Sequence, residues 1–285
     1  MELKAASVAQ DYAFAEQYNQ NLDQPKDLMI VHQDFKLQDL ENFEVNRRRM
    51  IGTMTTIDIP SFFSYVKRRE SEVDDPESRT FIDASNAKNQ LVARTVLNFG
   101  KTYEPGHCDD VAVLNMQHDP LFQEFLNTFE GETFGAVKFA DAFEDLIGVL
   151  KMNGHVEGER VAIASAISVI RNAKVDAAQN TTVRATQFTS EVSDMERVEI
   201  SSNGGQLPTY FSVITPLYLG LPDQEIFFKV KAETVPAGEN KTKLQFSIKP
   251  IGLLGAYLKA GKEFLNLISQ EFDPETVTIG TYSKK

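Results

Sequence analysis

The sequence predicts an α+β fold: a mixed strand, helix and meander half with two helices, then an antiparallel β-rich half closed by a helix. Three observations support this prediction. Asp119 and Pro120 open the first of two consecutive helical patterns. Several β-branched stretches in 181–250 are separated by Gly, Pro and Asn. Leucines and isoleucines at helical spacing then occupy 253–272.

The chain is expected to divide into an arm and a domain. Residues 1–28 favour a short helix and then turn polar around Pro25, which predicts a mobile N-terminal helix or arm. Residues 29–285 are expected to form a single α+β domain. The segment MNGHVEGE at 152–159 is expected to be a break between elements, and it is the candidate position for a subdivision.

The best defined local pattern is NRRRMIGTMTTIDIPSFFSYVKRRE at 46–70. Its Thr- and Ile-rich part at 50–59 predicts a strand. Pro60 is then suited to the first turn of a helix, where a missing amide hydrogen costs nothing. Aromatic and aliphatic side chains in 62–66 give that helix an apolar stripe, and basic residues at its end suit the helix dipole.

The remaining elements follow from periodicity and from turn residues. Strands are expected at 80–84, 91–99 and 111–116, the first two forming a hairpin-like pair within an antiparallel meander. Helices are expected from Pro120 to Gly131, at 136–151 and, because of its alanine content, at 160–178. Further strands are expected at 183–192, 197–201, 207–219, 225–235 and 243–249, with a final helix at 253–272 and a short tail from Pro274.

Composition points to a soluble, folded, cytoplasmic protein. The 285 residues are 42% hydrophobic and 25% charged, so the chain can bury a core without disulfides or metals. Its single cysteine, Cys108, cannot form an intrachain bridge, which fits a reducing compartment. No apolar run approaches the roughly 20 residues needed to span a membrane. The net charge of −12 disfavours general attraction to phosphate backbones, although a local basic patch would override that average.

One polar cluster is a candidate metal site. It comprises Asp83, His107, Asp109 and His118, with Cys108 and Asp110 beside them. Carboxylates and imidazoles are ligands of divalent ions, so the set would suit a metal-dependent hydrolase or nuclease. Adjacent side chains on a strand point to opposite faces, so at most one of the two neighbouring aspartates would serve one site. A turn leading into a strand explains the same residues equally well.

A second cluster is a candidate binding surface for phosphate. It combines Arg47, Arg48 and Arg49 with Lys67, Arg68 and Arg69, which would form one patch if the strand and the helix pack antiparallel. Guanidinium groups bind phosphate oxygens in pairs, which would suit single-stranded nucleic acid. The alternative is a solvated face and a helix end, because nearby acids such as Glu70 and Glu72 would offset the charge.

The sequence contains no recognisable catalytic or cofactor motif. It lacks a GxSxG elbow, and the neighbouring His107 and Cys108 do not form a dyad merely by adjacency. The pair Gly204 and Gly205 lacks the lysine of a phosphate-binding loop and indicates a hairpin turn. We therefore assign no catalytic residue and expect no cofactor.

Apolar residues in 34–70 carry a resemblance to a known family. They include Phe62 or Phe63 with Tyr65 and Val66, accompanied by Asp39-Leu40-Glu41 and by the arginines before Gly52. The pattern continues through 81–83, 106–112, 139–145 and 211–231. In these features the chain resembles the YfdQ-like family of uncharacterised phage and prophage proteins. It departs from that family in having no tryptophan. The resemblance implies a viral or prophage origin and action in the bacterial host cytoplasm, with no activity to inherit.

These observations favour a non-enzymatic binding protein that acts on host proteins or within a phage DNA-processing or recombination assembly. The alternative is the metal-dependent nuclease or hydrolase. A host or phage protein is the expected partner, nucleic acid is a candidate partner through the basic cluster, and no membrane partner is expected. The residues leave the oligomeric state open, a homo-oligomer included.

Overall fold

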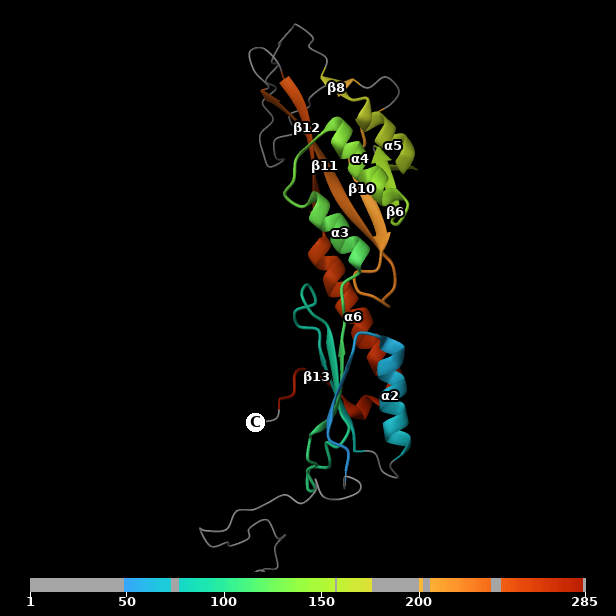
Figure 1. Ribbon diagram of the computed structural model, residues 1–285, viewed down its shortest axis with the longest axis vertical. Coiled ribbons are helices and arrows are strands. Elements are labelled where there is room, and N and C mark those ends of the chain that lie inside the picture. Colours follow the sequence, from blue (N-terminus) through green and yellow to red (C-terminus); the bar gives the residue numbers. More distant parts are fainter. Residues whose placement is uncertain are drawn as a thin grey trace, which may run out of the picture. The chain divides into compact units, whose positions relative to one another are not determined.

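The computed structural model describes residues 49–72, 77–156, 158–175, 200–201, 206–236 and 242–283 (Figure 1). By compactness the chain divides into Met1–Met50 and Ile51–Lys285. The arm predicted at 1–28 lies outside the described residues. Among the described residues, the second unit contains a five-stranded and a six-stranded β-sheet with helices against them, together with a separate two-stranded pair, which confirms the α+β class.

The first sheet has five strands and follows the predicted meander. Its order is β1 (Gly52–Thr56), β4 (Asp110–Asn115), β3 (Val92–Val96), β2 (Arg79–Asp83) and β13 (Val277–Ile279). Strands β2, β3 and β4 pair antiparallel, as expected. The two edge strands, β1 and β13, pair parallel with their neighbours, so the sheet is mixed.

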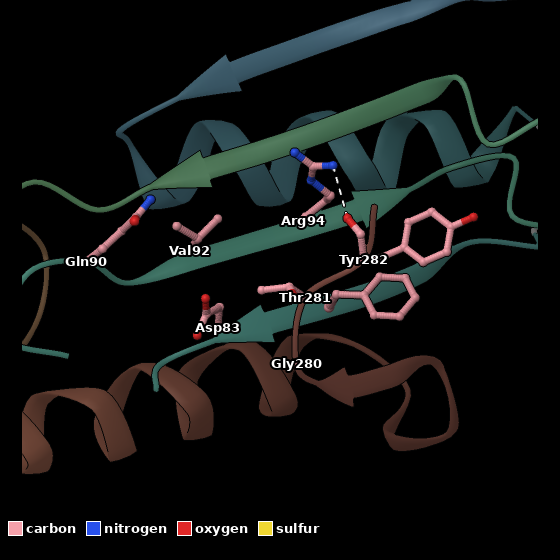
Figure 2. A pocket seen from close by; sticks show the side chains of 8 residues that line it. Asp83, Gln90, Val92, Arg94, Gly280, Thr281 and Tyr282 are labelled. Atoms are coloured by element: carbon pink, nitrogen blue, oxygen red, sulfur yellow. Dashed lines mark hydrogen bonds between the residues drawn. The ribbon is translucent and has the colours of Figure 1, made fainter. Parts of the chain in front are cut away.

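Helix α2 (Ile59–Ser71) covers one face of this sheet, and Figure 2 shows it behind the strands. Asp58 caps it by accepting a hydrogen bond from the backbone N–H of Ser61, and Pro60 occupies its first turn, as predicted. Phe62 and Val66 are fully buried. The end of α6 (Leu253–Glu271) packs beside α2, since the ring of Phe272 lies 6.1 Å from that of Phe62.

The second sheet has six strands, all antiparallel. Its order is β5 (Phe134–Gly135), β12 (Thr242–Ile251), β11 (Gln224–Pro236), β10 (Tyr210–Thr215), β6 (Lys151–Val156) and β7 (Glu159–Ala162). A separate short pair joins β8 (Lys174–Val175) to β9 (Ile200–Ser201). The helices against the sheet are α3 (Pro120–Phe129), α4 (Ala136–Ile147) and α5 (Ile163–Arg171). The antiparallel, β-rich second half is therefore confirmed.

Phenylalanine rings join these helices to the second sheet. Phe143 of α4 stacks on Phe211 of β10 with ring centroids 4.2 Å apart. Phe125 of α3 meets Phe228 of β11 at 4.8 Å. Side chains from alternate positions of β10, β11 and β12 thus point at the helices, and the intervening positions point away from them.

Three expectations about element boundaries were wrong. The segment 152–159 is not a break but most of the β6–β7 hairpin, and the helix expected at 136–151 ends at Ile147. A Cβ on Gly154 would lie 2.7 Å from that of Ala166, so glycine there lets α5 approach the strand rather than ending it. The expected tail contains a 3₁₀ turn, Pro274–Thr276, followed by β13. The strand expected at 183–192 lies outside the described residues.

Asp119 caps α3 as the sequence predicts, and its loss should be measurable. The carboxylate accepts the backbone N–H of Phe122 at 2.8 Å while being largely buried. Asp119→Ala should lower the free energy of unfolding by about 1 kcal/mol. Asp119→Asn, which keeps an acceptor oxygen, should cost less. Urea unfolding of both variants tests this, and equal losses would contradict a capping role.

No helix in the described part of the chain has the length and apolar character needed to cross a membrane.

Candidate functional site

The structure separates the four predicted metal ligands into two pairs. Strands β2 and β4 run in the same direction because each is antiparallel to β3. Asp83 ends β2 and His118 follows β4, whereas His107 and Asp109 precede β4. The two pairs therefore lie at opposite ends of the sheet, about 15 Å or more apart at roughly 3.3 Å per residue. One ion cannot bind both pairs.

Asp83, Asp109 and His118 each contact a side chain that has a structural role. Asp83 accepts from the backbone and the hydroxyl of Ser85, which lowers the pKa of its carboxyl below the ordinary value. Asp109 accepts from the side-chain amide of Asn98 at 2.8 Å. His118 stacks on Tyr218 at 4.2 Å. Among the described residues, no three His, Cys, Asp or Glu side chains converge as a metal site requires.

The predicted basic cluster is not a free cationic surface where the structure describes it. Arg47 and Arg48 lie outside the described residues, and Arg49 is the first described one. At the end of α2, Lys67 pairs with Glu271 and Arg68 with Glu72. The guanidinium of Arg69 binds Glu72 and the buried Asp110, each at 2.8 Å. These cations hold α2 to its surroundings.

A different basic surface lies on the second sheet, on the face turned away from the helices. In β11 the side chains of Ile226, Phe228 and Val230 are buried, so the alternate positions Lys229 and Lys231 point the other way. In β12 the same alternation turns Lys243 and Lys249 to that face. We call this surface the basic face; it comprises Arg160, His155, Tyr210, Lys229, Lys231, Lys243 and Lys249.

Strand register aligns five of these residues in one row. Arg160 pairs with His155, His155 with Tyr210, Tyr210 with Lys229, and Lys229 with Lys249. Directly opposed side chains in an antiparallel pair have Cβ atoms about 4.5–5.5 Å apart. Two lysines therefore face each other without an intervening acid. Like charges at such positions are destabilising, so the Lys229–Lys249 pair does not stabilise the sheet.

Among the described residues, the four lysines of the basic face have no ion-pair partner. In the described part of the chain, Lys229, Lys231, Lys243 and Lys249 form no ion pair, although Lys151, Lys67 and Lys259 do. The acids that share the face are Glu225, which is bound to Arg160, and Glu233. Four ammonium groups share this face with Glu233 as the one named acid that Arg160 does not bind, so the local potential is positive although the chain has a net charge of −12.

A hydrogen-bonded network anchors one end of the row. Ser212 donates to Glu225 at 2.7 Å and lies 3.0 Å from the Nε2 atom of His155, while Arg160 binds the same carboxylate at 2.6 Å. A serine beside a histidine and an acid suggests nucleophilic catalysis. However, Ser212 is fully buried and donates its proton to the carboxylate, so it cannot attack a substrate. The network fixes the geometry of the row.

Two aromatic side chains lie among the charged residues of the basic face. Tyr210 is half-buried within the row, and Phe227, which lies in the adjacent row, is 38% exposed. The ring of Phe227 lies 5.5 Å from that of His155. Ammonium groups can contact phosphates, and exposed rings can stack on bases, so the face has the chemistry of a single-strand binding surface.

Sequence reasoning missed this surface for a definable reason. The predicted cluster consists of consecutive cations, whereas the basic face is built from lysines at alternate positions of two strands. The pattern KVK at 229–231 and the lysines at 243 and 249 are visible in the sequence. Only the β11–β12 register shows that they share a face.

Comparison with known proteins yields a family. The family model described as "Uncharacterized conserved protein (DUF2303)" matches residues 2–282. Comparison with curated proteins and with solved structures finds no match.

Proposed function

The chain belongs to the DUF2303 family of uncharacterised conserved proteins, and from the basic face we propose that it is a non-enzymatic protein that binds single-stranded nucleic acid. The YfdQ-like pattern in 34–70 supports a phage or prophage origin, with action in the bacterial cytoplasm. In that setting the protein would serve a DNA-processing or recombination assembly.

The observation that supports this proposal is the group of four lysines on the basic face, none of which forms an ion pair with a residue that the structure describes. Binding of a phosphate backbone releases condensed counterions, and each lysine that replaces one strengthens the complex. Lys229 and Lys231 are two residues apart on β11, and Lys249 lies across from Lys229. This spacing presents several charges along and across the sheet. The exposed Phe227 adds a stacking surface that does not depend on base identity.

The alternatives have less support. A metal-dependent nuclease or hydrolase needs ligands that converge, and the four candidate ligands lie at opposite ends of a sheet. A phosphate surface at the end of α2 would need free cations, and Lys67, Arg68 and Arg69 are all paired. A host-protein partner stays a second candidate because the basic face would also suit an acidic protein surface.

Fluorescence anisotropy with a labelled single-stranded oligonucleotide tests the proposal. Affinity of the wild-type chain should fall steeply with salt. Lys229→Ala with Lys249→Ala should weaken binding at least tenfold at low salt. The same change should reduce the slope of log K against log salt by about 1.4, since each phosphate contact on a single strand contributes about 0.7.

The matched control is Lys88→Ala with Lys138→Ala. These exposed lysines also form no ion pair in the described chain, and they lie away from the basic face, in the β2–β3 connection and on α4. The control removes the same amount of charge as the test variant. Because its lysines lie away from the basic face, it should leave the slope of log K against log salt unchanged. An equal loss of affinity in both variants would contradict the proposal. So would wild-type binding that does not depend on salt concentration. Binding of an acidic host protein but not of nucleic acid would favour the second candidate.

A further inference from the structure

A groove lies on the five-stranded sheet, on the face opposite α2 (Figure 2). The segment Val277–Tyr282, which we call the strap, occupies part of it. Residues Val277, Thr278 and Ile279 pair parallel with Thr80, Phe81 and Ile82 along the outer edge of β2. The strap then crosses in front of that strand.

Hydrogen bonds and ring contacts hold the strap in the groove. The backbone N–H of Gly280 donates to the carbonyl of Ile82 at 2.8 Å, which ends the strand pairing. The ring of Tyr282 stacks on Phe81 with centroids 4.9 Å apart and meets the edge of Phe99 at 5.4 Å. Arg94 of β3 donates to the backbone carbonyl of Tyr282 at 3.2 Å. The groove thus recognises a strand, an aromatic ring and a carbonyl.

The groove is larger than its occupant. A half-open hollow of about 170 Å³ continues past Thr281. Val92 lies at its base, and Asp83 and Gln90 lie at its far end (Figure 2). The hydrogen bonds from Ser85 lower the pKa of Asp83, so this carboxylate stays ionised at neutral pH. An apolar stem with a cationic head would fill the hollow, whereas the short Thr281 side chain leaves it unfilled.

The strap is short and largely exposed for an element of a sheet. Strand β13 has three residues and lies at the sheet edge, and Ile279 is 74% exposed. Short edge segments with little burial open at low free-energy cost. Its departure would leave β2 as an edge strand with unpaired backbone groups, which is the surface that strand-adding peptides use.

We propose that this groove is a docking site for an extended segment of a partner protein, which the strap occupies in cis until it is displaced. The partner segment pairs parallel with β2, places an aromatic residue where Tyr282 lies, and places Lys or Arg where Thr281 lies. Its basic side chain runs over Val92 to Asp83. The site lies on a different sheet from the basic face and does not depend on nucleic-acid binding.

Binding of synthetic peptides to the full chain tests this proposal. The chain variant, which we call the released chain, carries Gly280→Pro and Tyr282→Ala; these changes remove the amide that binds Ile82 and the ring that binds Phe81, and they should release the strap. The probe is a labelled peptide with the sequence of 274–285 and the substitution T281K. The released chain should bind this peptide at least tenfold more tightly than the wild-type chain does, because the strap no longer competes.

Three controls identify the groove contacts. A peptide that also carries Y282A should bind at least fivefold more weakly, since it lacks the stacking ring. Arg94→Ala in the released chain should weaken the binding of every peptide, because it removes the donor to the backbone carbonyl. With Asp83→Asn in the released chain, the T281K peptide should no longer bind more tightly than the peptide with Thr281. The affinity of the peptide with Thr281 should stay unchanged. Absence of saturable binding to the released chain, or equal binding of peptides with and without the tyrosine, would overturn the proposal.

Discussion

Phe143→Ala is expected to lower the free energy of unfolding by about 3–5 kcal/mol, the largest effect among the single changes considered. The ring is fully buried and lies 4.2 Å from Phe211, 4.7 Å from Phe129 and 5.0 Å from Phe139, measured between centroids. It therefore joins two helices to the second sheet. Its removal leaves a cavity whose rigid aromatic lining cannot collapse to fill it.

Val137→Ala on the same helix is the control for Phe143→Ala. Val137 is 56% exposed, so its truncation should change stability by no more than about 0.5 kcal/mol. Urea unfolding should show a lower midpoint for Phe143→Ala with an unchanged m-value. A loss below about 1.5 kcal/mol would mean that the neighbouring rings close the cavity, and it would contradict the rigid cluster described above.

Arg69→Ala is expected to lower the free energy of unfolding by about 3 kcal/mol. The guanidinium binds Asp110, whose side chain is 7% exposed, and this hydrogen bond raises the pKa of Arg69 above its ordinary value. Without the guanidinium of Arg69, the buried carboxylate of Asp110 at the start of β4 loses its ion-pair partner. The variant should therefore loosen the contact between α2 and the first sheet.

Two comparisons test the origin of that loss. Lys67→Ala removes a cation from the same helix, but the Lys67 and Glu271 side chains are 53% and 42% exposed, so the cost should stay below about 1 kcal/mol. Adding Asp110→Ala to Arg69→Ala should restore part of the lost stability, because it removes the buried charge. A double variant that is less stable than Arg69→Ala would show that the carboxylate has another stabilising role.

Most helices and central strands could be predicted because their signals are local. Asp58 and Asp119 cap helices whose first turns contain the predicted prolines, and apolar periodicity locates α3, α4 and α6. The meander β2–β3–β4 follows from strand patterns separated by turns. These features depend on neighbours within a few residues, which the sequence displays directly.

The wrong predictions of element boundaries concern features that depend on residues distant in the sequence. Gly154 suggests a break, yet in the structure it makes room for Ala166 of α5. Strand β13 has three residues and no pattern of its own, and it becomes a strand because the edge of β2 lies beside it. Both outcomes arise from packing partners that are remote in sequence, and local propensity does not contain that information.

The candidate sites show the same division. Consecutive cations at 67–69 drew attention in the sequence, but the structure pairs each with an acid. The lysines at alternate positions of 225–235 and 243–249 fit strand patterns, which do not show that they share a face. The register of β11 with β12 places Lys229 opposite Lys249 and so creates the basic face.

The sequence by itself determined the α+β class and the main elements, because these follow from periodicity and turn chemistry. The tertiary structure decided which charges are compensated and which gather on one face. It also decided that Val277–Tyr282 occupies a groove beside β2. The physical reason is that charge pairing and strand pairing depend on distances between residues far apart in the chain, which only the folded molecule fixes.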